Sequence, residues 1–413
     1  MKDIWILLFG ILIFGACNNA GDGVTLKPIN SSIKGKKLNA EIVAGSTSHG
    51  NVVTIKVPKD GYSEAIEMNE LIDSFELVEL ETSRECIIGE IDKLLVTPNG
   101  YIILDKGNKK VFLFGLDGAF KKKIGSAGKG PKEYVSVYDV TIDNKEKRII
   151  LNDLDSRKFV YFDFDGNFIE SKPTYFLFQH WEMTSDFAVF NLGRSYNTKV
   201  PSIDKHRLAI GNLQLDSLCT FFHYERDNRC TYAAHRPLKK FNDKLYYYNF
   251  FVDTIYQVKG NGVEAGFALD FQGKGWPVKA GESISDDMVR KIIQHYSYFD
   301  GNYVLSEDFL FFRVYKEMRH LDVYYSLKTG NMKAGGALDH SLGRFLGMSF
   351  VPPMTVTWKN EFVSVIEPFK VLQNEEYINK DPKLNEGGRV KEVMQSIKLE
   401  DNPLLLIYKL KEF

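Results

Sequence analysis

Hydrophobic and polar residues alternate along most of the chain in short runs of about four to eight residues, the period of β-strands rather than of helices. The clearest runs form a pattern that occurs twice. Asp105, Lys110, Phe114, Asp117, Gly118 and Phe120 recur 48 residues later as Asp153, Lys158, Phe162, Asp165, Gly166 and Phe168. Each copy predicts a strand ending in Asp, a tight link, an aromatic strand and an Asp-Gly hairpin turn. A repeated unit of this kind predicts the blade of a β-propeller.

Four strands are predicted in each of these two blades. Those of the first are Ile91–Thr97, Tyr101–Asp105, Lys110–Phe114 and Phe120–Ile124, and those of the second are Val137–Asp143, Arg148–Asp153, Lys158–Phe162 and Phe168–Glu170. Weaker alternation predicts four more blades. The third has the strands Phe187–Leu192 and Arg207–Leu213, and the fourth has Phe221–Tyr224, Lys244–Phe250 and Thr254–Val258. The fifth has Phe267–Phe271, Tyr303–Leu305, Phe309–Val314 and Leu321–Leu327, and the sixth has Val356–Trp358, Glu361–Ile366 and Leu404–Leu410. Five or seven blades remain alternatives to six.

The predicted fold class is therefore all-β, a six-bladed β-propeller with short helical insertions. Pairing of Leu404–Leu410 with the alternating run Phe75–Leu80 would close the ring and hide two sheet edges. Apolar residues at helical spacing predict insertions at Ser285–Tyr296 and Asn374–Ile397. The second insertion either caps the central channel or packs against the outside. The composition, with 13% aromatic residues, suits strands.

The first seventeen residues predict that the protein is located in the cell envelope. Lys2 precedes an apolar run too short to span a bilayer as a helix, and the run ends in Phe14-Gly15-Ala16-Cys17. This ending resembles the lipobox of bacterial lipoproteins. The resemblance implies a signal peptide over residues 1–16, lipidation of Cys17 and a membrane anchor. A lipidated flexible tether is expected over residues 17–50, and the propeller domain over 51–413.

A glycine-rich run joins the first two blades: Gly125-Ser-Ala-Gly128-Lys-Gly130-Pro131-Lys-Glu133-Tyr134. Together with Phe251-Val-Asp253-Thr254-Ile255-Tyr256 and Asp401-Asn402-Pro403-Leu404, this run resembles the six-bladed, NHL-like β-propeller lipoproteins of Bacteroidetes-type bacteria. The resemblance implies the propeller fold and an outer-membrane lipoprotein, periplasmic or surface-exposed. It implies no activity.

The links between blades and the turns between second and third strands emerge at the same end of a propeller. Residues on these loops are candidates for binding a ligand: Lys106, Lys109, Lys129, Tyr134 and Arg157. The glycine-rich run is also explained as a crossover that needs unusual backbone angles. Together with the predicted anchor, these candidates favour a non-catalytic protein that binds a peptide, a glycan or a partner protein on its loop face.

The alternative is a metal-assisted hydrolase or lyase, lactonase-like, with carboxylates at the central channel. Its candidate ligands for Ca²⁺ or Zn²⁺ are Asp105, Asp153 and Asp253. Asp105 and Asp153 are better explained as caps on backbone amides of the turns that they begin. The eight His residues form neither HxH nor HExxH, and a Gly-x-Ser-x-Gly elbow is absent, so no catalytic residue is assigned.

Charge and cysteine content add two constraints. The formal net charge of −1 gives no basic excess, so nucleic acid is not an expected partner. In an oxidising envelope Cys219 and Cys230 would form a disulfide and leave Cys86 free; three separate thiols explain the sequence equally well.

Overall fold

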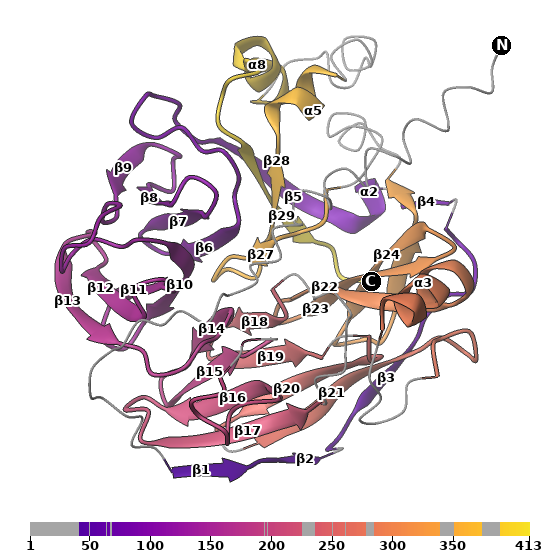
Figure 1. Cartoon of the computed structure of the whole chain (residues 1–413). Helices are drawn as coiled ribbons and strands as arrows, with labels where there is room; N and C mark the ends of the chain where they lie inside the picture. Colours follow the sequence, from indigo (N-terminus) through magenta and orange to yellow (C-terminus); the bar gives the residue numbers. More distant parts are fainter. Residues whose placement is uncertain are drawn as a thin grey trace.

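Six antiparallel sheets surround a central axis in the computed structural model (Figure 1). The structure describes residues 41–413 apart from residues 49, 63, 67, 194, 196, 225–235, 250, 261, 278–284, 339–350 and 374–388. The arrangement is a six-bladed β-propeller, so the predicted fold class and the predicted number of blades are confirmed.

Each blade has four antiparallel strands, named in the order from the innermost strand outward. Blade 1 is β6 (Lys93–Thr97), β7 (Gly100–Asp105), β8 (Lys110–Phe114) and β9 (Phe120–Lys123); blade 2 is β10 (Val137–Asp143), β11 (Arg148–Asp153), β12 (Lys158–Asp163) and β13 (Phe168–Pro173). Blade 3 is β14 (His180–Met183), β15 (Phe187–Asn191), β16 (His206–Asn212) and β17 (Ser217–His223); blade 4 is β18 (Leu238–Phe241), β19 (Lys244–Tyr248), β20 (Thr254–Lys259) and β21 (Gly262–Asp270). Blade 5 is β22 (Ser297–Leu305), β23 (Phe309–Lys316), β24 (Arg319–Ser326) and β25 (Met332–Gly335); blade 6 is β27 (Thr355–Val356), β28 (Phe362–Ile366), β29 (Leu404–Leu410) and β5 (Ile72–Glu79).

Blade 6 joins the two ends of the folded chain. β29 supplies its third strand and β5 its outermost strand, with Leu404 opposite Glu79 and Tyr408 opposite Phe75. This pairing confirms the predicted closure. It also gives both strands a partner, so neither presents an unpaired inner edge.

The segment before β5 follows the outer edges of blades 3 to 5, and we call Glu41–Ile66 the N-terminal strap. β1 (Glu41–Ala44) pairs in parallel with β17 of blade 3. β2 (Ser46–Ser48) and β3 (Val53–Lys56) pair in parallel with β21 of blade 4. β4 (Ala65–Ile66) pairs with β26 (Ala337–Leu338), beside blade 5. Figure 1 shows the strap in indigo along the outside of these blades.

The strap corrects one predicted boundary, because residues 41–48 belong to the propeller and not to the tether. Short polar strands such as Ser46–Ser48 carry no alternating apolar signal, and their order comes from pairing with distant strands. Gly45 lies between β1 and β2 under the ring of Phe221. A Cβ atom at Gly45 would lie 2.0 Å from that ring, so the strap lies close to blade 3 only because this residue is glycine.

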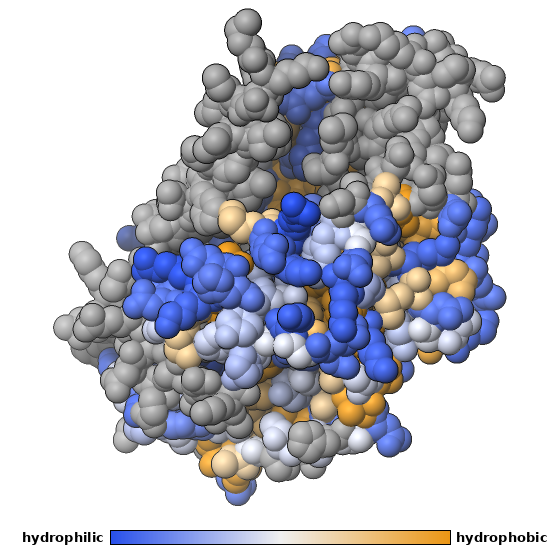
Figure 2. Space-filling model, turned by 90° about the vertical axis from the view of Figure 1, so that its right-hand side faces the viewer, coloured by the Kyte–Doolittle hydropathy of each residue, from blue (hydrophilic) through white to orange (hydrophobic). Residues whose placement is uncertain are grey.

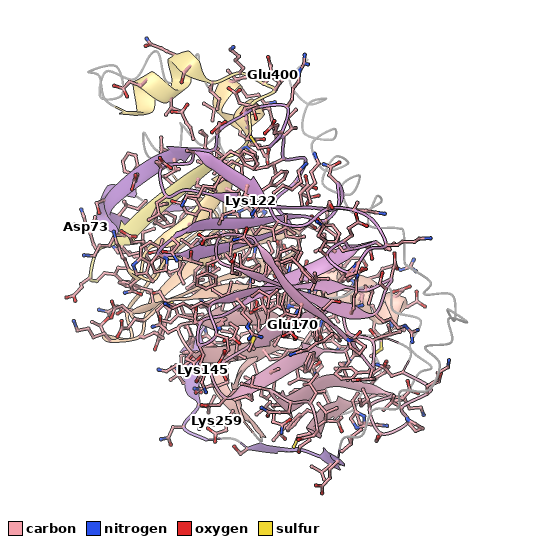
Figure 3. All side chains as sticks on the ribbon, turned by 90° about the vertical axis from the view of Figure 1, so that its left-hand side faces the viewer. Asp73, Lys122, Lys145, Glu170, Lys259 and Glu400 are labelled. Atoms are coloured by element: carbon pink, nitrogen blue, oxygen red, sulfur yellow. The ribbon has the colours of Figure 1, made fainter. Side chains whose placement is uncertain are left out.

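The outer edges of blades 1 and 2 differ from those of blades 3 to 5, since no described strand pairs with the outward-facing edge of β9 or β13. Both edge strands carry charge: Lys122 lies on β9, and Glu170 lies on β13 (Figure 3). Charged side chains on an edge strand oppose pairing with another chain. The opposite side of the molecule, at the right of Figure 1, is largely hydrophilic, with its hydrophobic groups in small separate patches (Figure 2).

Four short helices lie outside the sheets in the described residues: α2 (Met68–Leu71), α3 (Asp286–His295), α5 (Pro368–Leu372) and α8 (Arg389–Ser396). The predicted insertion at Ser285–Tyr296 is confirmed as α3, where the Ser285 hydroxyl accepts a hydrogen bond from the Met288 amide at 3.3 Å. α8 falls in the second predicted insertion, and residues 374–388 of that insertion lie outside the described residues. Among described residues, no helix has the length and apolar character needed to cross a membrane.

Blades 1, 2 and 6 were predicted strand for strand, whereas the boundaries of blades 3 to 5 were wrong. The predicted strand Phe221–Tyr224 belongs to the outer strand β17 of blade 3, and Phe267–Phe271 belongs to the outer strand β21 of blade 4. The innermost strands β14 and β18 were missed. β18 reads Leu-Lys-Lys-Phe, and such polar residues hide a strand from an analysis based on hydrophobic alternation.

Candidate functional site

A cavity of about 870 Å³ lies on the propeller axis. The innermost strands of all six blades contribute to its wall. One lining residue from each of blades 1 to 6 is, in order, Lys93, Asp139, Glu182, Lys239, Asn302 and Thr355. Its volume falls in the range of pockets that hold small ligands, about 300–1,000 Å³.

Charged side chains gather at one end of this cavity. All six innermost strands begin at that end, because each follows the link from the preceding blade. Asp92 precedes β6, Asp139 lies near the start of β10, His180 begins β14 and Arg236 precedes β18. The topology of the fold therefore brings together residues that are up to 144 positions apart in the sequence.

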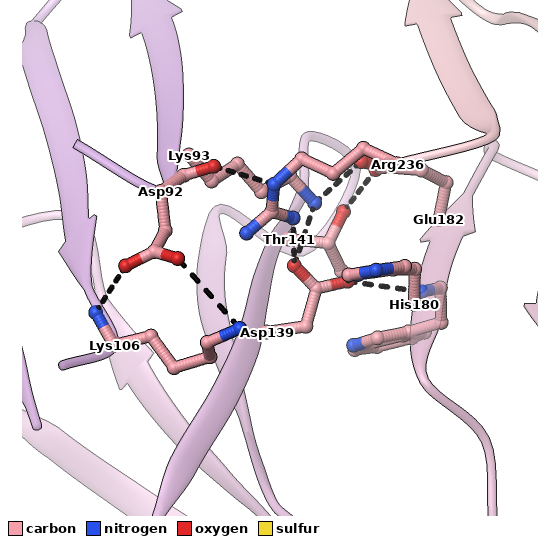
Figure 4. A network of polar contacts seen from close by, with 9 residues as sticks. Asp92, Lys93, Lys106, Asp139, Thr141, His180, Glu182 and Arg236 are labelled. Carbon is pink, nitrogen blue, oxygen red and sulfur yellow. Dashed lines mark hydrogen bonds and ion pairs between the residues drawn. The ribbon is translucent and has the colours of Figure 1, made fainter. Parts of the chain in front are cut away.

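Asp139 is at the centre of this charged group, which Figure 4 shows. Its side chain is fully buried, and its Oδ1 atom lies 3.2 Å from the Lys93 ammonium and 2.9 Å from the Arg236 guanidinium. Its Oδ2 atom accepts a hydrogen bond from the Trp181 amide at 2.9 Å. Burial raises the pKa of the Asp139 carboxyl, but Lys93 and Arg236 outweigh burial and hold this pKa well below its usual range.

Lys93 also contacts Glu182, at 2.6 Å, and Glu182 accepts a hydrogen bond from the Thr141 hydroxyl at 2.6 Å. Arg236 donates a second hydrogen bond through Nε to the backbone carbonyl of Asp92. The network thus ties blades 1, 2 and 3 to the segment that enters blade 4 (Figure 4). A buried charge network of this kind fixes geometry more than it stabilises, since desolvation opposes the attraction.

The carboxylate of Asp92 is also paired. It accepts a hydrogen bond from the Lys106 amide at 2.7 Å and lies 3.7 Å from the Lys106 ammonium. The same ammonium lies 4.9 Å from the centre of the Tyr138 ring. Each of the three carboxylates Asp92, Asp139 and Glu182 therefore has at least one cationic partner.

Lys239, the second residue of β18, differs from the other cations of the network. It is half-buried in the cavity wall, and its ammonium has no hydrogen bond or ion pair with any described residue. Burial, together with the nearby Arg236 and Lys93, lowers the pKa of Lys239 to about 8. The Glu182 carboxylate opposes this shift but is in contact with Lys93, so a partly desolvated cation faces the cavity without a direct ion pair to any described residue.

Aromatic side chains line the cavity from blades 4 and 5. Tyr246, Phe251, Tyr298 and Tyr315 contribute to this wall, and the rings of Tyr298 and Tyr315 are stacked 5.2 Å apart. Asp300 lies on the same wall, where burial raises the pKa of its carboxyl. The cavity therefore combines a charged end with an aromatic side, as ligand sites commonly do.

Asp105 and Asp153, two of the candidate metal ligands, are fully buried and bind backbone amides. Asp105 accepts from the amides of Gly89 at 2.7 Å and Asn108 at 2.9 Å. Asp153 accepts from the amides of Val135, Ser136 and Ser156 at 2.9, 3.1 and 3.2 Å. Each Asp thus fastens the preceding inter-blade link to its own turn, which is the capping role expected from the sequence.

Asp253, the third candidate metal ligand, directly precedes β20 in blade 4 and is half-buried; burial raises the pKa of its carboxyl to about 7. The structure does not bring it together with Asp105 and Asp153, which lie in blades 1 and 2. Within the described ranges, no three His, Cys, Asp or Glu side chains are grouped to hold a metal ion. Cys17 and Cys230 lie outside these ranges, whereas Cys219 lies on β17 and Cys86 is buried.

None of the five candidate ligand-binding residues lines the cavity. Lys106 approaches it most directly, through its ion pair with Asp92. Lys109 and Lys129 are exposed, and Arg157 is half-buried with a left-handed φ of 51°. Tyr134 is fully buried among the core residues between blades 1 and 2, so its side chain does not reach the loop surface.

The glycine-rich link folds on itself. Glu133 accepts a hydrogen bond from the Gly130 amide at 2.8 Å, and Gly128 and Tyr134 are joined through their backbones. Gly125 has a left-handed φ of 67°, and a Cβ atom there would lie 2.9 Å from the Tyr134 ring. These contacts fit the crossover explanation of this motif.

The residues that form the charged end were missed by sequence reasoning. One signal was available: charged residues interrupt apolar segments at Lys93 and Asp139, where a strand with two packed faces should be apolar. Arg236 gave no signal, because it lies in an irregular segment before a strand that was itself missed.

The fold and the axial cavity define a six-bladed β-propeller whose innermost strands enclose a charged and aromatic site. A family model described as a domain of unknown function (DUF4934) matches residues 52–409, and the chain belongs to this family. None of the curated proteins matches the sequence.

Solved structures are similar to this chain in fold. A Bacteroides fragilis protein described as a "Putative exported protein" is 18% identical, with 88% of this chain and 100% of that chain covered and a TM-score of 0.68. A member of the DUF4221 family from Bacteroides vulgatus is 7% identical, with 83% and 99% covered and a TM-score of 0.47. A streptogramin B lyase is 10% identical, with 82% and 98% covered and a TM-score of 0.38.

Proposed function

We propose that this protein is a non-catalytic binding protein of the bacterial cell envelope, and that its ligand enters the axial cavity from the charged end. The observation that carries the proposal is the cavity itself, which all six blades line with charged and aromatic groups. A peptide or a glycan, or the protruding end of a partner protein, fits these dimensions and this mixture of groups.

The site is built for binding a ligand in a fixed position. Asp139, Glu182 and Lys93 are held by one another and by backbone groups, so the wall near them is rigid before a ligand arrives. A preorganised wall lowers the entropic cost of association. The assigned hydrogen bonds leave these carboxylates paired with cations, which suits a structural role better than proton transfer.

The envelope address rests on the sequence Phe14-Gly15-Ala16-Cys17, which resembles a lipobox, and the similar Bacteroides fragilis protein carries the description of an exported protein. We infer that Cys17 is lipidated and that the propeller is attached to the outer membrane. Metabolic labelling with an alkyne fatty acid tests this: the full chain is labelled, and Cys17→Ser is not. Labelling of both chains contradicts the assignment.

The binding role is tested by a thermal-shift screen of the full chain against glycans and peptides, with a variant that fills the cavity. Thr355 lies on the short strand β27 and lines the cavity, so Thr355→Trp places a large ring in the cavity. A ligand of the cavity raises the melting temperature of the wild type and has no effect on Thr355→Trp. An equal shift in both proteins contradicts a site on the axis.

A further inference from the structure

We propose, building on the proposed function, that the ligand carries a carboxylate and that this carboxylate binds the ammonium of Lys239. The proposal starts from the balance of charge at the charged end. Five cations (Lys93, Lys106, Arg236, Lys239 and Lys240) face three carboxylates (Asp92, Asp139 and Glu182), and the ammonium of Lys240 donates a hydrogen bond to the Met183 carbonyl. Three of the cations contact these carboxylates, and Lys239 does not.

An unpaired ammonium in a cavity wall is unfavourable, because desolvation opposes its charge. The lowered pKa of Lys239 reports this cost. A protein retains a destabilising buried charge of this kind when binding of a ligand removes the unfavourable free energy. A single negative charge in the cavity neutralises Lys239 and restores its solvation by a direct hydrogen bond.

The other groups of the wall indicate a carboxylate rather than a phosphate monoester. Phosphate sites favour the guanidinium fork of Arg, which binds two oxygens at once. The fork of Arg236 is already engaged with the Asp92 carbonyl and the Asp139 carboxylate. The anion site is thus left with one point charge, which matches a singly charged group better than a doubly charged one.

The carboxylate comes from one of two sources, the C-terminus of a peptide or a sugar acid such as a uronic acid. Both place an apolar or ring face next to the charged group. This apolar or ring face of the ligand is expected to contact the aromatic wall of the cavity. In that wall, Tyr246 lies on β19, next to β18, and the stacked Tyr298 and Tyr315 lie in blade 5. The structure assigns the shared chemistry, and the experiment distinguishes the sources.

Isothermal titration of the full chain with matched pairs of probes tests the inference. Trigalacturonate is compared with its methyl ester, and a tripeptide is compared with its C-terminal amide; inorganic phosphate is a further probe. The acid form of one pair binds, and its neutral partner binds at least tenfold more weakly. The pair that shows this difference identifies the source of the carboxylate.

Two variants assign the effect to Lys239. Lys239→Met weakens binding of the acid form at least tenfold, and Lys239→Arg, which keeps the charge, retains most of it. Lys244→Met is the matched control, because Lys244 is an exposed lysine on the neighbouring strand β19. It leaves the affinity unchanged.

Several results overturn the inference. These are equal binding of acid and neutral forms, binding of phosphate alone, binding that Lys239→Met does not change, and no binding by any probe. If neutral forms bind and Thr355→Trp abolishes their binding, the inference fails but the binding function of the cavity stands. If the probes bind Thr355→Trp as well as the wild type, the proposed site on the axis fails too.

Discussion

Lys93, in the innermost strand of blade 1, contacts Glu182, in the innermost strand of blade 3, at 2.6 Å. Its ammonium also contacts Asp139 of the intervening blade at 3.2 Å. Neighbouring blades of this propeller pack through apolar cores, but this lysine joins two blades that are not adjacent in the ring. The charged end is therefore a part of the fold's geometry as well as a candidate site.

Replacing Asp139 with Asn is expected to destabilise the protein by about 3–5 kcal/mol, because Lys93 and Arg236 then remain buried without their shared counter-charge. Asp155→Asn, at an exposed position, is expected to change stability by less than about 0.5 kcal/mol. Urea unfolding of both variants measures the difference. A loss no larger for Asp139→Asn than for Asp155→Asn contradicts the central position of Asp139 in the network.

The same carboxylate predicts a dependence of stability on pH. The folded-state pKa of Asp139 lies below the unfolded value of about 3.9. Its contribution to stability is therefore complete above about pH 4 and is lost as the pH falls through the folded pKa. Below pH 4, the wild type is expected to lose stability more steeply than Asp139→Asn. Parallel curves from melting temperatures between pH 6 and pH 2 would rule this out.

Lys239→Met is expected to raise the melting temperature of the unliganded protein by a few degrees, since it removes a half-buried cation that has no partner among the described residues. The folded pKa of about 8 lies below that of an unfolded lysine, so the destabilisation is full at pH 7 and decreases as the pH rises through the pKa of about 8 and on to about 10.4. The gain from Lys239→Met should therefore be smaller at pH 10 than at pH 7. Scanning calorimetry at both pH values provides the measurement, with Lys244→Met as the control.

Asp153→Ala is expected to cost about 3 kcal/mol, because three backbone amides around the link between blades 1 and 2 lose their acceptor. Asp165→Ala removes an exposed carboxylate from a turn of the same blade and should cost much less. Melting curves with and without Ca²⁺ separate the capping role from a metal role. A capping residue gives the same loss in both, whereas a loss that appears only with Ca²⁺ would point to metal binding.

Gly45→Val is expected to loosen the N-terminal strap, since its side chain would overlap the ring of Phe221. Gly260→Ala is the control: Gly260 is exposed, and a Cβ atom there meets its nearest neighbour at an ordinary 3.5 Å. Hydrogen exchange in residues 41–48 should increase in Gly45→Val while exchange in blade 1 stays unchanged. Unchanged exchange in the strap would show that the close packing at Gly45 does not hold it.

The sequence was sufficient to predict the middle strands of the blades and the closure of the ring. Leu404–Leu410 and Phe75–Leu80 carry strong apolar alternation, and their pairing follows from the need to cover two edges. It was insufficient for the innermost strands. Lys239 and Lys240 belong to a strand whose polar side chains face an axial cavity, so the local pattern has no feature that marks a strand.

The same limit explains why the residues of the candidate site were not predicted from the sequence. The loop residues Lys106, Lys109 and Lys129 were predicted from exposure and charge, and none of them lines the cavity. The residues that do line the charged end come from four distant segments. Only the circular arrangement of the blades brings Asp92 and Arg236 together, and no spacing within one segment encodes this contact.

The N-terminal strap has a consequence for how the chain acquires its structure. β1 is made first, but its partner β17 begins at Ser217, and the partner of β4 begins at Ala337. Ring closure waits longer still, for β29 near the end of the chain. Such distant pairings slow folding, because long loops must close before their contacts form. Because β5 and β29 depend on each other, blade 6 completes its fold only after β29 has been made.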